Sequence, residues 1–176
     1  MRSGRAIFLD RDGVVNQVIF RDGKPAGPRH VSEFEFESGI EEPIRRLRAA
    51  GFKLFVVTNQ PDIARGLLTA EQLHLMTDNI IVTLQIDAVR ICPHDDHDRC
   101  SCRKPSPGML LDLAREYDVT LAQSYLIGDS WKDTLAARAA GCESIMLDRP
   151  YNQDDPADSR ASDLSQAVDI ILGETR

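Results

Sequence analysis

Three cysteines and one histidine lie close together in this 176-residue chain, in a pattern that suits a metal ion. The array reads Cys-x-His-x5-Cys-x-Cys and consists of Cys92, His94, Cys100 and Cys102. Three thiolates and one imidazole complete the tetrahedral shell of Zn²⁺, and a closed shell is typical of a structural site. The pattern therefore predicts a zinc loop over residues 92–102, in which His97 is the alternative imidazole ligand.

A basic pair, Arg103 and Lys104, follows this array directly and precedes a turn rich in Pro and Gly. A lysine on a protein surface is usually solvated. Its position beside the predicted zinc loop favours another interpretation, in which the metal shapes a loop that presents positive charge to an anion.

Two carboxylates, Asp10 and Asp12, follow the apolar run Ala6–Leu9, which is typical of a buried parallel strand. Residues i and i+2 of an extended chain point the same way, so both carboxylates are expected to face one site. Gly13 permits a sharp turn after them. Like charges this close are usually held by a cation or share a proton. A surface turn is the alternative for this motif taken alone.

Asp129 ends another expected strand and Asp133 comes four residues later, in the first turn of an expected helix. Taken singly, they suit an N-cap and compensation of the helix dipole. Several acids at neighbouring strand ends would be destabilising without a cation, and oxygen ligands suit Mg²⁺. We therefore assign Asp10, Asp12, Asp129 and Asp133 to a magnesium site.

Thr58 and Asn59 end a further strand and offer a hydroxyl and backbone N–H groups, which are good donors to phosphate oxygens. A plain strand-to-loop cap is the alternative interpretation. A carboxylate nucleophile, a neighbouring acid, a divalent cation, a hydroxyl and a lysine together suit phosphoryl transfer through a covalent aspartyl-phosphate.

The elements that must position these residues alternate between strand and helix, which predicts βαβ units, a doubly wound parallel sheet and helices on both faces. Ligands of such sheets bind beyond the carboxyl ends of the strands, where the polar clusters fall. We expect strands over 6–9, 53–57, 88–91, 125–127 and 144–147, and helices over 40–50, 69–84, 107–114, 131–140 and 163–172. Residues 16–32 and 148–162 are predicted to be loops.

The length favours a single domain over residues 1–176, and the net charge of −7 argues against a nucleic-acid partner, which needs a basic face. No apolar run approaches the length that spans a bilayer, and the start lacks the apolar segment of a signal peptide. We therefore expect a cytoplasmic protein with no membrane partner. We expect a monomer that acts on a small phosphorylated molecule.

With these motifs assembled, residues 5–172 resemble a phosphatase of the haloacid dehalogenase (HAD) superfamily. The resemblance implies that Asp10 is the nucleophile and that Asp12 protonates the leaving alkoxide. Thr58 and Lys104 would stabilise the transferred phosphoryl group. The implied ligands of Mg²⁺ are Asp10, the main-chain carbonyl of Asp12 and Asp129, while Asp133 is either a ligand or the partner of Lys104.

The zinc loop resembles the branch that contains heptose bisphosphate phosphatases and histidinol-phosphate phosphatases, and this resemblance favours His94 over His97 as the ligand. The segments around Thr58–Arg65 and Arg103–Met109 resemble the heptose enzymes, whereas the short gap between His94 and Cys100 resembles the histidinol enzymes. We expect the 7-phosphatase of a heptose 1,7-bisphosphate, with a histidinol-phosphate phosphatase as the alternative. The substrate-binding residues assigned on this basis are Arg11, Asn59, Gln60, Arg65 and Arg103.

The loop over residues 18–30 is unlike the short loop expected from the resemblance. No region is long enough for a large cap domain, so this loop and the zinc loop would form a partial lid over an open site. Arg21 and Arg29 in this loop are further candidates for contact with a second phosphate. A nucleic-acid-binding zinc ribbon and a catalytically silent phospholigand sensor are the competing classes, and the acidic balance and the full set of expected catalytic residues disfavour them.

Overall fold

The computed structural model describes residues 4–174 and centres on a parallel sheet in the strand order β5-β4-β1-β6-β7-β8. Every pair of neighbouring strands in this sheet runs parallel. The strands are β1 (Ala6–Leu9), β4 (Lys53–Asn59), β5 (Ala88–Cys92), β6 (Tyr125–Gly128), β7 (Glu143–Leu147) and β8 (Arg160–Ala161). The doubly wound α/β fold expected from the sequence is confirmed.

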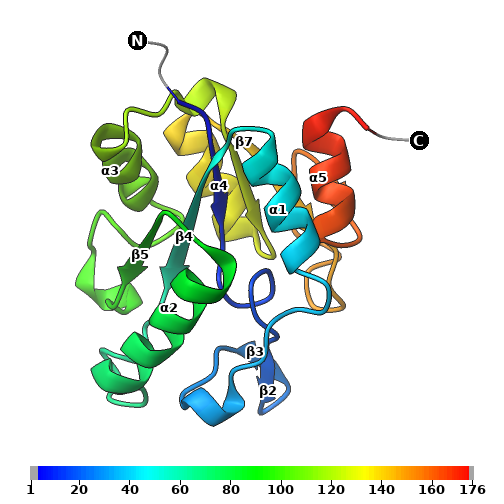
Figure 1. Cartoon of the computed structure of the whole chain (residues 1–176). Helices are drawn as coiled ribbons and strands as arrows, with labels where there is room; N and C mark the ends of the chain where they lie inside the picture. Colours follow the sequence, from blue (N-terminus) through cyan, green and yellow to red (C-terminus); the bar gives the residue numbers. More distant parts are fainter. Residues whose placement is uncertain (1–3, 175–176) are drawn as a thin grey trace.

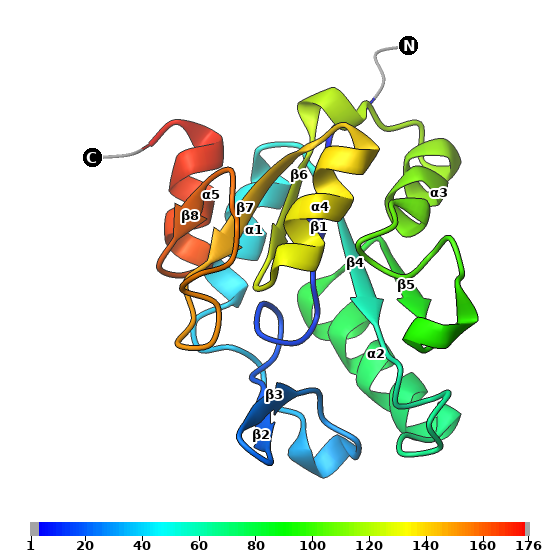
Figure 2. The same ribbon diagram turned by 180° about the vertical axis from the view of Figure 1, so that it is seen from behind.

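Helices cover both faces of the sheet (Figures 1 and 2). They are α1 (Glu41–Ala49), α2 (Ala70–Leu84), α3 (Gly108–Glu116), α4 (Trp131–Ala140) and α5 (Leu164–Leu172). Buried side chains of α1, α2 and α5 contribute to one core cluster, whereas those of α3 and α4 contribute to the cluster on the opposite face.

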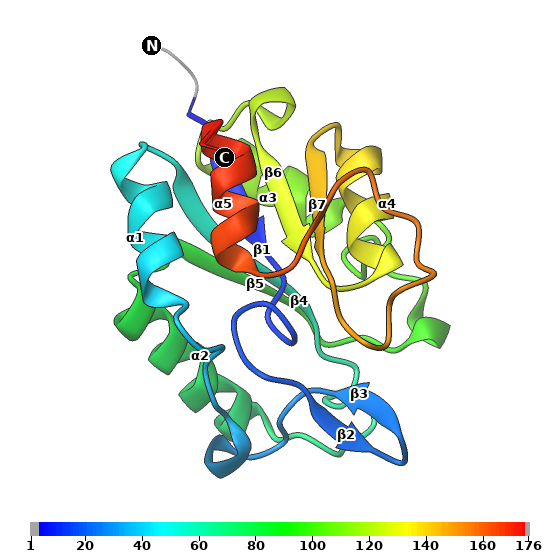
Figure 3. The same ribbon diagram turned by 90° about the vertical axis from the view of Figure 1, so that its right-hand side faces the viewer.

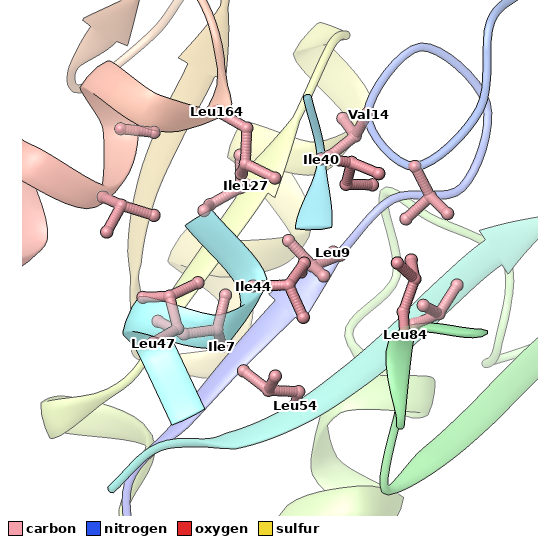
Figure 4. Close-up of a cluster of buried hydrophobic side chains, with 14 of the residues drawn as sticks. Ile7, Leu9, Val14, Ile40, Ile44, Leu47, Leu54, Leu84, Ile127 and Leu164 are labelled. Atoms are coloured by element: carbon pink, nitrogen blue, oxygen red, sulfur yellow. The ribbon is translucent and has the colours of Figure 1, made fainter. Parts of the chain in front are cut away.

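The strand sequences explain why two cores form. Side chains alternate between the faces of a strand, so Ile7 and Leu9 of β1 enter one cluster while Ala6 and Phe8 enter the other. Figure 4 shows Ile7 beside Leu47 and Leu9 beside Ile44, two residues of α1 in the first cluster. A strand buried on both faces holds the residue that follows it firmly in place, which suits β1 as the base for Asp10.

The helix ends follow the expected capping chemistry. The Thr69 hydroxyl accepts a hydrogen bond from the backbone N–H of Gln72, and the Asp163 carboxylate accepts one from that of Gln166. Gly141 ends α4 in the left-handed conformation, as a C-terminal glycine does.

Two segments expected to be loops contain strands. Residues 16–32 include an antiparallel hairpin, β2 (Ile19–Arg21) and β3 (Lys24–Ala26), followed by a short 3-10 helix over Val31–Glu33. The turn at Asp22 and Gly23 has positive φ at both residues, as an Asp-Gly hairpin turn requires. The Asp-Gly pair is a hairpin signal that can be seen in the sequence. The flanking strands are short, however, and Pro25 argues against a strand. Residues 148–162 contain the edge strand β8.

The hairpin lies at the end of the sheet toward which the central strands point, opposite the chain termini (Figure 3). It is therefore placed to border a site at the carboxyl ends of the strands, as expected for a small lid. Residues 1–3 and 175–176 of the single domain predicted over 1–176 lie outside the described range. No helix within residues 4–174 is long and apolar enough to cross a membrane.

Candidate active site

The carboxyl ends of β4, β1 and β6, which are neighbours in the sheet, bring the predicted acidic residues together. Asp10 follows β1, and its backbone N–H donates to the carbonyl of Ile127 in β6 at 2.9 Å. Asp129 follows β6, and Asp133 lies in the first turn of α4. One carboxylate oxygen from each of the three lies within 4.8 Å of the others. The sheet therefore creates a cluster of like charges that needs positive charge.

The Lys104 ammonium supplies part of that charge from a buried position, with a side chain only 2% exposed. Its Nζ lies 2.8 Å from Asp10 Oδ1 and 2.6 Å from Asp133 Oδ1, and it donates to the carbonyl of Val57 at 2.9 Å. All three donors of the ammonium are thus used. Burial alone would lower the pKa of Lys104, but the charges of Asp10 and Asp133 outweigh it and hold that pKa above its ordinary value.

The backbone of Lys104 is fixed by the side chain at the end of β4. Asn59 donates from Nδ2 to the Lys104 carbonyl at 2.9 Å, and its Oδ1 accepts from the Lys104 N–H at 3.0 Å. This paired contact holds a loop residue as a neighbouring strand would. Asn59 therefore positions the lysine, besides bordering the pocket.

Asp10 is placed to react with an electrophile. Burial raises its pKa to about 7, with Lys104 acting against this and Asp133 adding to it. The backbone N–H of Arg11 donates to Asp10 Oδ1 at 2.7 Å. A divalent cation beside Asp10 would lower this raised pKa and keep the carboxylate ionised, as a nucleophile requires.

The other two carboxylates differ in what they can still bind. Asp133 is 2% exposed, and its Oδ2 accepts from the N–H and hydroxyl of Ser130 at 3.2 and 2.9 Å, while Oδ1 accepts from Lys104. Protein groups thus use both of its oxygens, which favours Asp133 as the partner of Lys104. Burial, then the charges of Asp10 and Asp133, raise the pKa of Asp129 well above its ordinary value, so Asp129 most needs a cation.

The carboxylate of Asp12 is held by donors from three side chains. Its Oδ1 accepts from Arg11 Nη2 at 2.9 Å and from Asn16 Nδ2 at 3.0 Å, and its Oδ2 accepts from Gln60 Nε2 at 2.8 Å. Gly27 of the hairpin segment packs directly on this group, because a β-carbon there would lie 2.7 Å from Asp12 Oδ2. Asp12 is therefore oriented from the β1 loop, from the β4 loop and from the hairpin.

Thr58 at the end of β4 is 1% exposed, and its Oγ1 accepts from Gln60 Nε2 at 2.9 Å. Because Gln60 occupies an acceptor position of this oxygen, the hydroxyl proton of Thr58 is available to another acceptor. The same Gln60 amide thus fixes both Thr58 and Asp12.

These groups lie at the base of an open pocket of about 480 Å³. Asp10, Asp12, Lys104 and Asp129 line its floor, and Val18, Pro25 and Ala26 of the hairpin segment form an apolar wall. Arg65, Arg103 and Lys132 add positive charge farther out. Such a pocket suits a polar, anionic molecule with one anionic group at the carboxylates.

The cysteine-rich loop gathers its four ligand atoms at the end of β5. The three Sγ atoms lie 3.2–3.5 Å from one another, and His94 Nδ1 lies 3.5 Å from Cys92 Sγ and 3.3 Å from Cys102 Sγ. A tetrahedral ion bound at thiolate distances would separate such ligands by roughly 3.8 Å, so the set suits a metal with little adjustment. His97 lies outside this cluster.

Arg103 connects this loop to the pocket. Its Nε donates to Asp96 Oδ1 at 2.7 Å and its Nη1 to the carbonyl of His94 at 3.2 Å, within the loop that carries the metal ligands. Lys104 follows it directly. The fold of the loop therefore determines where both cations lie.

Comparison with known proteins agrees with this geometry. The HAD-hydrolase-like family model matches residues 101–167. The D-glycero-β-D-manno-heptose-1,7-bisphosphate 7-phosphatase of Bordetella bronchiseptica is 41% identical over 143 residues, covering 78% of this chain and 77% of that enzyme. The enzyme of the same name from Escherichia coli K12 is 38% identical over 176 residues, covering 92% and 88%. The chain belongs to the D-glycero-β-D-manno-heptose-1,7-bisphosphate 7-phosphatase family of HAD-like hydrolases.

A solved structure of this phosphatase family also matches closely. The B. bronchiseptica D,D-heptose 1,7-bisphosphate phosphatase, complexed with magnesium and phosphate, has a TM-score of 0.81 and 34% identity. The alignment covers 97% of this chain and 99% of that one. The family relationship thus extends over the sheet, the pocket and the cysteine-rich loop together.

The arginines named as substrate-binding residues or as candidates for a second phosphate differ in their contacts in this phosphatase. Arg11 is 1% exposed and directed at Asp12, which suits a role in positioning that carboxylate rather than contact with substrate. Arg21 pairs with Glu33 and Arg29 with Asp62, and neither arginine borders the pocket. Arg65 borders the pocket but also pairs with Asp95.

Tyr151 is a residue of the phosphatase site that the sequence analysis missed. Its hydroxyl donates to Asp129 Oδ2 at 2.5 Å, and its ring borders the pocket. The available signal was its position directly after β7, which neighbours β6 in the sheet, because loops at that end converge on the site.

The buried contacts of Lys104 lead to a stability prediction for the Lys104→Met variant without added metal. Removing one partner of a buried pair leaves uncompensated charge and costs about 3–5 kcal/mol of unfolding free energy. Lys104 lowers the pKa of Asp10, so without Lys104 this pKa rises above about 7 in the folded state and the loss is fully present only above the raised pKa. We expect it to shrink between about pH 8 and about pH 6, as the Asp10 carboxyl group takes up a proton.

Urea unfolding at the two pH values measures this effect, and Lys24→Met, at an exposed lysine of the hairpin, is the matched control. The control should change stability by no more than about 0.5 kcal/mol. A loss in Lys104→Met that is small or grows as the pH falls would contradict the electrostatic account.

Proposed function

We propose that this protein hydrolyses the 7-phosphate of D-glycero-β-D-manno-heptose 1,7-bisphosphate through an aspartyl-phosphate on Asp10. The observation that carries the proposal is the Asp10 carboxylate, held by Lys104 at the floor of an open, cation-rimmed pocket beside Asp12. Relatives of that name at 38–41% identity support the choice of substrate.

In the first step, an oxygen of Asp10 attacks the phosphorus atom and the bond from phosphorus to the sugar oxygen breaks. Asp12 donates a proton to that leaving oxygen, so the products are the free sugar hydroxyl and an acyl phosphate on Asp10. The Thr58 hydroxyl and the Lys104 ammonium stabilise the charge on the phosphoryl oxygens.

In the second step, Asp12 takes a proton from water and the water oxygen attacks the phosphorus atom. The bond from phosphorus to the Asp10 oxygen breaks, which regenerates the carboxylate and releases inorganic phosphate. Because Asp12 gave up its proton in the first step, it is already the carboxylate that acts as this base. The openness of the pocket admits the water.

We assign Mg²⁺ to Asp10, Asp129 and the main-chain carbonyl of Asp12. The clustered, buried carboxylate oxygens fit this hard cation, because the single charge of Lys104 leaves the three acids undercompensated. When bound, the cation supplies positive charge at the phosphoryl oxygens. Asp133 then serves mainly to fix Lys104.

We assign Zn²⁺ to Cys92, His94, Cys100 and Cys102, where it closes the loop and has no part in the reaction. Burial raises the pKa of the Cys92 thiol to about 12, so a cation is needed to hold it as a thiolate. In this view zinc fixes the loop from which Arg103 and Lys104 extend toward the substrate.

A bisphosphate requires a second anion site, and we assign it to Arg103 together with Arg65 on the outer rim. Arginine pairs with phosphate through two parallel hydrogen bonds. Both guanidinium groups already contact aspartates, Asp96 and Asp95, so a phosphate would replace or share those partners.

The covalent step predicts that Asp10→Asn loses activity while the protein stays folded. An amide is a poor nucleophile, so turnover should fall at least about a thousand-fold. The melting temperature should not fall, because the variant removes one of three crowded charges. Phosphate release and thermal unfolding measure these effects, with Asp22→Asn in the hairpin turn as the matched control. Substantial residual turnover would contradict an aspartyl-phosphate.

The assigned substrate predicts a large preference among phosphate esters. We expect kcat/KM for D-glycero-β-D-manno-heptose 1,7-bisphosphate to exceed that for histidinol phosphate by at least about a hundred-fold, since Arg103 and Arg65 would meet the second phosphate. The same assay on heptose 7-phosphate isolates the contribution of that phosphate. A higher value for histidinol phosphate would favour the alternative function instead.

The zinc assignment predicts that Cys102→Ala loses its metal and binds substrate poorly. Loss of the ion should loosen the loop and lower kcat/KM about ten-fold or more, with Mg²⁺ present throughout. Elemental analysis gives the zinc content and steady-state kinetics the activity. Cys142→Ala is the matched control, because Cys142 is a buried cysteine of the core outside the cluster. Full activity in a zinc-free Cys102→Ala protein would refute the positioning role.

A further inference from the structure

Asp129 lacks the support that the other two buried carboxylates receive. Asp10 and Asp133 each pair with Lys104, whereas no arginine, lysine or histidine forms a salt bridge with Asp129 within residues 4–174. In that part of the chain, the Tyr151 hydroxyl makes the hydrogen bond to its side chain, at Oδ2. Tyr151 therefore sets the orientation of this carboxylate before a cation arrives.

The loop after β7 is built to hold Tyr151 in this place. The neighbouring Asn152 is 2% exposed, and its Nδ2 donates to the carbonyls of Asp129 at 2.6 Å and of Leu147 at 2.9 Å. Its Oδ1 accepts from the N–H of Arg149 at 2.9 Å. Consecutive residues thus bind Asp129 twice, Asn152 at the backbone and Tyr151 at the side chain.

The contact between Tyr151 and Asp129 also depends on a space left by Gly13. A β-carbon at Gly13 would lie 2.1 Å from Asp129 Oδ2 and 2.8 Å from the Tyr151 hydroxyl. The φ angle of Gly13 is +83°, which other residues rarely adopt. The turn after the nucleophile therefore leaves room for the hydroxyl and the carboxylate to meet.

Phe20, in strand β2 of the hairpin, packs against the ring of Tyr151. The ring centroids lie 6.1 Å apart at 66°, an edge-on contact. Phe20 is 58% exposed, so its burial contributes little to the core, and the ring of Tyr151 is its aromatic partner. The hairpin and the loop after β7 lie toward the same end of the sheet in Figure 3.

We propose that Tyr151 is a positioning residue that orients Asp129 for the divalent cation, and that Phe20 on the hairpin holds the Tyr151 ring for this task. The proposal rests on the cation site of the proposed function. A hydrogen bond at Oδ2 would leave Oδ1 available to the ion, and such outer partners commonly change metal affinity ten- to a hundred-fold. The small lid thereby contributes to cation binding as well as to the pocket wall.

The test measures Mn²⁺ binding to the zinc-loaded protein by electron paramagnetic resonance, without substrate. We expect Tyr151→Phe to raise the dissociation constant for Mn²⁺ about ten-fold, while zinc content and melting temperature stay unchanged. Tyr117→Phe is the matched control, because the Tyr117 hydroxyl donates to the carbonyl of Asp87 away from the pocket. It should leave the constant within about two-fold. Unchanged or tighter Mn²⁺ binding in Tyr151→Phe would overturn the proposal.

A double-mutant cycle tests the part played by the hairpin. Phe20→Ala should weaken Mn²⁺ binding about two- to five-fold in the wild-type background and have no effect in the Tyr151→Phe background, because Phe20 acts through the hydroxyl. Equal effects in both backgrounds would overturn the role of Phe20.

Asp129→Asn separates this proposal from the cation site itself. Loss of Mn²⁺ binding in that variant, combined with wild-type affinity in Tyr151→Phe, would overturn only the positioning role. Mn²⁺ binding that survives Asp129→Asn would overturn the assigned cation site and, with it, the proposal for Tyr151.

Discussion

The arrangement of the site depends on one buried ammonium group. Lys104 lies where the ends of β4, β1 and α4 meet, and without its charge the sheet would bring Asp10 and Asp133 together with no internal compensation. The third N–H group of the Lys104 ammonium donates to the carbonyl of Val57, so none of its three N–H groups is left to bind water. A fully used ammonium can neutralise only part of three carboxylates. The three carboxylates and the one ammonium leave a net negative charge of about two, which suits a divalent cation.

Because Lys104 belongs to a loop, the fold has to define its position by means other than a strand. Two sets of contacts do so, one from Asn59 and one from the cysteine-rich array. Asn59, at the end of β4, binds the Lys104 backbone through both its N–H and its carbonyl. The cysteine-rich array fixes the preceding residues, and Arg103 binds back to the carbonyl of His94 within it. The array was the most conspicuous chemical feature of the sequence, but its contribution is geometric. With the proposed zinc ion bound, it would hold in place a segment that has neither helix nor strand between η2 (Asp96–Asp98) and α3.

The sequence predicted those parts of the molecule in which local pattern and chemistry agree. The run Ala6–Leu9 followed by Asp10 predicted both a buried strand and the place of an acid at its end, because a parallel sheet directs all such ends to one edge. It did not predict which side chains Asp12 would meet, since Asn16 and Gln60 approach it from loops whose paths depend on the whole fold. The same reason explains why the sequence does not predict what the Arg11 side chain contacts. Its position in the motif predicts proximity to the site, but only the packing of Gly27 over it decides that its charge is buried against Asp12. Tyr151 was missed because a tyrosine in a polar loop carries no pattern of its own.

The hairpin illustrates how a small lid can serve an open site. A large cap would exclude bulk water and order the groups beneath it by burial, whereas Ile19–Ala26 covers one side of the pocket only. Groups that no large cap covers need explicit hydrogen bonds to hold their orientation, and the site supplies them from Gln60 to Asp12 and from Tyr151 to Asp129. Hydrolysis of the acyl phosphate requires water at Asp10, so complete closure would hinder the second step. The contact of Gly27 with Asp12 and that of Phe20 with Tyr151 let the hairpin order the acids at its edge while the pocket remains open to water and to a long phosphosugar.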